Sequence, residues 1–179
     1  MKKLGFTVIL IAMLTGCTSI TTARYSVSID NNQALKAYAG SAVKLESLTL
    51  GTKYDADCRM AGPIMAIDKM TINQFVMKAI NDELKFGNVY SESGTKLTGT
   101  LTKVEFSSSE GLTNGWWDLY ITLDSSNGKS MQASNKYDFK SGFDAITACN
   151  NTAQALGPAV QDLINVIVSD PAFKELIAP

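Results

Sequence analysis

Apolar and polar residues alternate along four stretches of the chain, as they do in strands that bury one face. The four predicted strands are 42–50, 96–106, 117–124 and 131–139. The alternation changes phase near Glu46-Ser47 and again near Lys103, which predicts an irregularity at each place. Asn127-Gly128, between the last two stretches, is typical of a tight hairpin, so the last three strands should form an antiparallel meander.

Two further stretches repeat their apolar residues at the spacing of an amphipathic helix, and capping residues mark their ends. The first predicted helix begins after Thr71, which can form a capping box with Gln74, and ends at Gly87, a residue suited to a left-handed position. The second begins after Asp144 and is followed by a short C-terminal turn. Pro158 lies inside it and lacks a backbone N–H, which predicts a kink or a restart there.

The order of these elements, β-α-β-β-β-α, indicates the fold class. A strand, a helix and a second strand favour a parallel pair with a right-handed connection. Each helix has an apolar stripe to bury, and the sheet has one apolar and one polar face. We therefore expect an α+β domain over 41–179, a four-stranded mixed sheet with two helices packed on one face.

The first 17 residues have a different pattern, which predicts export. Lys2 and Lys3 precede an apolar run over 6–14 that is too short to span a bilayer. The run continues through Leu-Thr-Gly directly into Cys17, and this arrangement resembles the lipobox of bacterial lipoproteins. The resemblance implies a signal peptide over 1–16 and acyl chains on the cysteine that fix the mature chain to a membrane. The alternative is an ordinary signal peptide with an incidental cysteine.

The segment after the cysteine is polar, rich in small residues and weakly periodic. We predict a lipidated N-terminus and a flexible tether over 17–40, followed by a single periplasmic domain. In the lipoproteins that this chain resembles, an Asp directly after the lipidated cysteine commonly retains the protein in the inner membrane. The residue here is Thr18, so the resemblance implies the periplasmic face of the outer membrane.

Composition narrows the classes of function. The 16 basic and 17 acidic residues give a formal charge of −1, so there is no basic excess to neutralise phosphates and we expect no nucleic-acid partner. The absence of histidine excludes His-dependent triads and removes the commonest transition-metal ligand. No nucleophile or phosphate-loop motif occurs. We therefore expect no enzymatic activity, no cofactor and no metal site.

Two cysteines remain beyond Cys17, and export would place both in an oxidising compartment. Cys58 and Cys149 allow one intramolecular pairing, which would close a loop of about 90 residues and remove on the order of 4–5 kcal/mol of unfolded-state entropy. That disulfide would join the loop before the first helix to the start of the last helix. The alternative is two separate buried thiols.

Three stretches suggest a family resemblance: the helix INQFVMKAINDEL, the hairpin around SSNGKSM and the closing SDPAFKEL. In this order, and behind a lipobox, they resemble the YajG family of enterobacterial lipoproteins. More loosely, they resemble the auxiliary lipoproteins of envelope lipid-transport systems and the lipoprotein of the lipopolysaccharide-assembly translocon. The resemblance implies an α+β domain with no defined activity, and it carries over no functional side chain.

Three features are candidate surfaces for a partner. The loop before the first helix contains Met60, Ile64 and Met65, and flexible methionines suit adaptable contacts, although these residues could instead cover the end of the core. Trp116 neighbours Trp117, which shares the parity of the core residues, so Trp116 should lie on the polar side or the rim. There it could contact a partner or pack at an edge. The third candidate is the polar face of the sheet.

These features favour a non-enzymatic accessory lipoprotein of the envelope that binds another envelope component. Anchoring by lipid would raise its effective concentration near membrane-resident partners. A lipid or small-ligand carrier is an alternative that requires a continuous apolar cavity of at least about 300 Å³. An inhibitor or immunity lipoprotein is another, and would present a loop such as 54–67 to an enzyme cleft. The sequence indicates neither the partner nor the oligomeric state.

Overall fold

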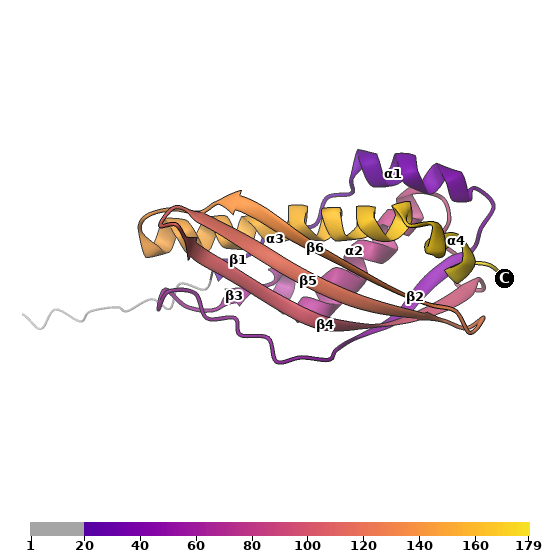
Figure 1. Cartoon of the computed structure of the whole chain (residues 1–179), viewed down its shortest axis with the longest axis horizontal. Coiled ribbons are helices and arrows are strands. Elements are labelled where there is room, and N and C mark those ends of the chain that lie inside the picture. The colour runs from indigo at the N-terminus through magenta and orange to yellow at the C-terminus, as the bar shows by residue number, and fades with distance from the viewer. Residues whose placement is uncertain (1–19) are drawn as a thin grey trace, which may run out of the picture.

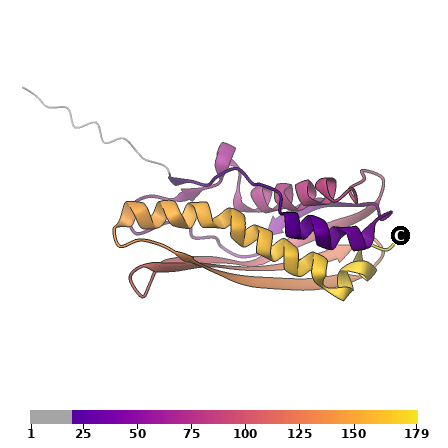
Figure 2. The ribbon, with the colours of Figure 1, turned by 90° about the horizontal axis from the view of Figure 1, so that it is seen from above.

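The computed structural model describes residues 20–179, so the predicted signal and Cys17 lie outside the described residues. A four-stranded mixed sheet forms one layer of the domain, and helices cover one of its faces (Figures 1 and 2). The strands are β2 (Val43–Leu50), β4 (Thr95–Glu110), β5 (Asn114–Ser125) and β6 (Ser130–Lys140), in the order β2-β4-β5-β6. β2 and β4 are parallel and the other pairs are antiparallel, which confirms the predicted α+β fold.

The two long helices, α2 (Ile72–Phe86) and α3 (Ala145–Ser169), pack on the same face of the sheet, and a short helix α4 (Pro171–Leu176) closes the chain. The core lies between these layers. Trp117 is completely buried there, as its parity predicted, and its indole N–H donates to the carbonyl of Thr152 at 2.8 Å. The sheet and α3 are therefore joined by a buried hydrogen bond as well as by apolar contact.

The irregularities predicted in the strands are present. The pairing of β2 with β4 shifts register between Leu45 and Ser47, which lets both Leu45 and Leu48 face the core. The pairing of β4 with β5 shifts between Leu101 and Lys103. The hairpin between β5 and β6 has Gly128 at a φ of +84°, a conformation that glycine adopts readily.

The predicted helix starts are also confirmed. The side chain of Gln74 accepts a hydrogen bond from the backbone N–H of Thr71 at 2.9 Å, and the carboxylate of Asp144 accepts one from Thr147. The predicted restart at Pro158 is wrong, because α3 runs through it without interruption and bends along its length in Figure 2. The carbonyl that lost its donor belongs to an exposed turn of the helix, where water can hydrogen-bond to it.

The role predicted for Gly87 is wrong. Its φ of −77° is open to any residue, and the left-handed position falls to Asn88 instead, at +58°. Gly87 is required for a different reason, since a Cβ there would lie 2.7 Å from Cδ1 of Leu35. The glycine therefore lets a second segment approach the end of α2.

That second segment is the stretch predicted to be a flexible tether over 17–40, and its described part is folded onto the domain. β1 (Ile20–Thr21) pairs with β3 (Ile64–Met65) in a two-stranded parallel sheet. Helix α1 (Ile29–Leu35) and a 3-10 turn, η1 (Lys36–Tyr38), follow and lie beside α3 (Figure 1). The prediction of a tether is therefore corrected from residue 20 onward.

A buried carboxylate holds this segment in place. Oε1 of Glu83 on α2 accepts hydrogen bonds from the Tyr25 hydroxyl at 2.6 Å, the Ser28 N–H at 2.7 Å and the Asn31 amide at 3.2 Å. Burial and the contact with Glu83 raise the pKa of the Tyr25 phenol, so the hydroxyl remains a donor. Polar residues make these contacts, which is why apolar periodicity did not reveal them.

Candidate functional site

An apolar pocket with a volume of about 510 Å³ opens between the irregular segment 50–70 and the start of α2. Its walls come from the loop after β2, from β3, from the 3-10 turn η2 (Ile67–Lys69), from the first turn of α2 and from the middle of α3. The lining side chains are Leu50, Thr52, Lys53, Tyr54, Ala56, Ile64, Met65, Ala66, Lys69, Met70, Thr71, Ile72, Asn73 and Leu156. The volume exceeds the roughly 300 Å³ that a small-ligand site requires.

Buried side chains form the inner wall of the pocket. Ile64, Ile72 and Leu156 are at most 6% exposed and belong to the core cluster. Tyr54 is half-buried, and its ring stacks on that of Trp117 with 6.5 Å between centroids. Burial, together with the neighbouring Asp55, raises the pKa of the Tyr54 phenol, so this wall carries no charge.

Basic side chains lie at the pocket, and an acidic neighbour is already paired. Lys53 and Lys69 are lining residues. Asp68, next to Lys69, forms a bidentate ion pair with Arg24, with an Nη1–Oδ2 distance of 2.7 Å. The pocket therefore combines apolar walls with two lysines, an arrangement that suits an apolar group bearing a negative charge.

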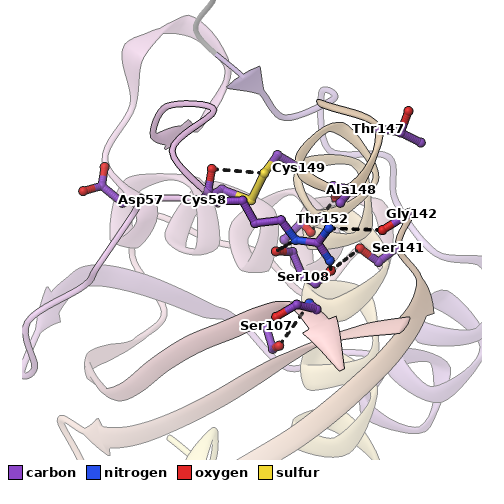
Figure 3. The surroundings of a disulfide bond; sticks show 12 residues. Asp57, Cys58, Ser107, Ser108, Ser141, Gly142, Thr147, Ala148, Cys149 and Thr152 are labelled. Atoms are coloured by element: carbon purple, nitrogen blue, oxygen red, sulfur yellow. Dashed lines mark hydrogen bonds between the residues drawn. A yellow bond between two sulfur atoms is a disulfide. The ribbon is translucent and has the colours of Figure 1, made fainter. Parts of the chain in front are cut away.

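The irregular segment is fixed at its outer turn. Cys58 and Cys149 form a disulfide, with 5.9 Å between their Cα atoms, which joins the segment to the first turns of α3 (Figure 3). Arg59 donates to Oγ of Ser108 at 3.0 Å and to the carbonyl of Phe143 at 3.1 Å. The backbone of Arg59 has a φ of 45°, and these contacts offset that strain. The pocket is therefore preformed rather than assembled from a loose loop.

The predicted contact residues do not all lie together. Ile64 and Met65 line the pocket, and Met65 is 38% exposed at its edge. Ile64 is only 3% exposed and pairs with Ile20, which favours the alternative that it covers the end of the core. Met60 is fully exposed away from the pocket. Trp116 lines a separate hollow of about 280 Å³, with Lys136 5.0 Å from its ring centroid.

Sequence patterns did not identify Tyr54, Met70 or Leu156 as parts of one site. Each has an adequate explanation as a core or loop residue, and only the tertiary structure brings them together. The density of Met and Ile over 60–70 was the one signal available in the sequence. It located one wall of the pocket without indicating the other.

Other features of the described residues add no chemical centre. Within 20–179, no three Cys, Asp or Glu side chains are grouped so that they could hold a metal ion. Over the same range, every helix is too short or too polar to cross a membrane. A second hollow of about 540 Å³ lies over the ends of β5 and β6, and charged side chains such as Glu110, Lys136 and Asp138 line much of it. The apolar pocket is therefore the stronger candidate for ligand binding.

Comparisons with known proteins find similarity to solved structures. No protein-family model matches the chain, and no curated protein matches it. Among solved structures, a putative lipoprotein from Caulobacter crescentus CB15 is similar, with a TM-score of 0.40 and 11% sequence identity. The similarity covers 79% of this chain and 92% of that one.

Proposed function

We propose that the chain is a non-enzymatic accessory lipoprotein of the bacterial envelope. Acyl chains on Cys17 would hold it at the periplasmic face of the outer membrane, and the apolar pocket would bind another envelope component. The observation that supports binding is the preformed pocket of about 510 Å³ beside β3. The lipobox supports the anchor.

Lipid anchoring and pocket binding strengthen one another in this proposal. Two or more acyl chains give stable membrane attachment, which raises the effective concentration of the domain near membrane-resident partners. A pocket held by a disulfide and by Arg59 loses little conformational entropy when it is filled. A modest apolar contact is then sufficient for a stable complex on the membrane.

The anchor is tested by expressing the full chain and a Cys17→Ala variant in the native host. We expect the unmodified chain to lose residues 1–16, to gain the mass of its acyl chains and to float with membranes. The Cys17→Ala chain should have no acyl mass and should stay out of the membrane fraction. An unacylated mature N-terminus in the parent chain would refute the proposal.

Binding through the pocket is tested by photocrosslinking in intact cells. A photoreactive phenylalanine derivative replaces Met65 at the pocket edge, and the control carries it at Tyr120, which is 42% exposed on the opposite face of the sheet. We expect the Met65 position to give at least fivefold more of one discrete protein adduct. Equal yields from both positions, or no adduct from either, would contradict binding through the pocket.

A second candidate function is carriage of a lipid or another small amphiphile. It is favoured by the apolar walls and by the two lysines at the pocket, which suit an acyl chain with an anionic head. The probe is oleate, titrated into the disulfide-bonded protein and followed by native mass spectrometry. A one-to-one complex weakened at least tenfold by Lys53→Glu plus Lys69→Glu would support carriage. The absence of any complex would contradict carriage and favour a protein partner in the pocket.

A further inference from the structure

Exposed apolar side chains are concentrated at one end of the domain. Among the described residues, five large apolar side chains are more than half exposed: Met60, Phe143 (79%), Ile29 (74%), Leu112 (68%) and Ile146 (53%). All except Ile29 lie on the turn after Cys58, on the turn between β4 and β5, or where the connection from β6 enters the first turn of α3. Scattered apolar side chains are normal on a protein surface, but a cluster of them at one end indicates a surface that contacts a protein partner or a membrane.

Hydrogen bonds tie these three loops into one surface. Arg59 spans from its own turn to Ser108 on β4 and to the carbonyl of Phe143. The N–H of Ser141 donates to the carbonyl of Thr113 at 2.8 Å, which joins the other two loops. Figure 3 shows Ser108, Ser141 and Gly142 around the disulfide, where these loops converge. The exposed side chains therefore project from a fixed platform rather than from independent loops.

The predicted lipid attachment lies close to this platform. Ile20 pairs with Ile64, and Figure 1 places β1 toward the end of the molecule where the three loops lie. Only Thr18 and Ser19 separate Cys17 from Ile20, and the three steps from Cα to Cα span at most about 11 Å. With Cys17 acylated as proposed, the bilayer surface therefore lies close to Ile20, and the domain cannot move far from the bilayer.

We propose that this end of the domain is a bilayer-contacting surface. This inference rests on the lipid anchor of the proposed function. Four exposed side chains insert into the interface between headgroups and acyl chains: Met60, Leu112, Phe143 and Ile146.

Charged groups at this end are engaged or offset one another. Arg59 donates to Ser108 and Phe143, and the acidic Asp144 caps α3. Lys140 donates to Asn114 and lines the same hollow as the exposed Glu110, of opposite charge. Insertion should therefore depend little on anionic lipid or on salt.

Tryptophan emission tests the proposal on the acylated full-length mature protein. Phe143→Trp reports from the proposed surface, and Phe86→Trp is the matched control, 49% exposed at the far end of α2 beside α1. Both variants retain Trp116 and Trp117, so the background emission is equal. The proteins are reconstituted into vesicles of phosphatidylethanolamine and phosphatidylglycerol with or without brominated acyl chains.

We expect brominated lipid to quench the Phe143→Trp signal at least twofold more than the Phe86→Trp signal, with a blue shift only at position 143. The difference should persist in 0.5 M salt. Equal quenching in protein that floats with the vesicles would overturn the orientation while leaving the anchor intact. Protein without acyl mass that does not float would overturn the anchor and the orientation together.

Discussion

Glu83 is a buried carboxylate with an uneven set of contacts. Oε1 accepts hydrogen bonds from Tyr25, Ser28 and Asn31, whereas Oε2 has no partner among the described residues. A buried acceptor without a partner lowers the stability of the fold, but removing the carboxylate would leave the surrounding donors without an acceptor. Its contribution to stability is therefore best measured by comparing an isosteric change with a truncation.

We expect Glu83→Ala to lower the free energy of unfolding by about 3 kcal/mol or more, because three donors lose their acceptor and a cavity opens. Glu83→Gln keeps an oxygen at that position and should cost clearly less. Urea unfolding of the disulfide-bonded protein gives the values. Glu105→Ala, at an exposed ion pair with Lys103, is the control and should change stability by less than about 1 kcal/mol. Equal losses from both Glu83 variants would show that charge, rather than hydrogen bonding, is decisive.

The helices α1 and α2 approach each other closely at Gly87. Alanine at this glycine and alanine at Gly157 in α3 should change the free energy of unfolding in opposite directions. Gly87→Ala would place a Cβ 2.7 Å from Leu35, so we expect a loss of about 1–3 kcal/mol and faster amide exchange in α1. Gly157→Ala, inside α3, meets no atom within 4 Å outside its own helix. It should stabilise the protein by about 0.5–1 kcal/mol.

Urea titration and hydrogen exchange measure both variants. If Gly87→Ala left the free energy of unfolding unchanged, α1 could shift without loss of stability. The packing of α1 on α2 would then be weaker than the contacts indicate. A destabilising Gly157→Ala would contradict the open space beside that position.

Elements with local periodicity could be predicted from the sequence, and elements held by distant polar contacts could not. The alternation around Trp117 and the cap at Asp144 each lie within a few residues, so the main strands and helices followed from them. Helix α1 buries Asn31 and Leu35 but leaves Ile29 exposed, so its apolar stripe is too sparse to detect. Its position depends on Glu83, which is more than fifty residues away in the chain.

The pocket was beyond sequence analysis for a related reason. Its walls come from Tyr54, Ile72 and Leu156, which lie on three separate segments. Each residue satisfies an ordinary structural role, so none stands out in a pattern. The disulfide between Cys58 and Cys149 was open to prediction, because the predicted export and the two cysteines that remain beyond Cys17 favour it. What the pairing organises, a fixed platform beside the pocket, required the tertiary structure.

That disulfide is the covalent link between the irregular segment and the helical layer, and its removal should affect the whole molecule. In the chain-entropy relation, a closed loop of about 90 residues corresponds to roughly 4–5 kcal/mol of stability. We expect Cys58→Ser plus Cys149→Ser to lose stability of that order in urea. Proteolysis should then begin within 50–66, because that segment has little regular structure of its own.

The same variant separates the pocket from the rest of the fold. The sheet and α3 are joined independently by the bond from Trp117 to Thr152, so the far-ultraviolet spectrum should persist in the absence of denaturant. Arg59, adjacent to Cys58, should lose its fixed contacts with Ser108, and loosening of the pocket wall should follow. Reductant is the control, since it should reproduce these changes in the parent protein and have no effect on the variant. If the variant kept both its stability and its protease resistance, the bonds of Arg59 alone would suffice to hold the segment, and the disulfide would be dispensable for the pocket.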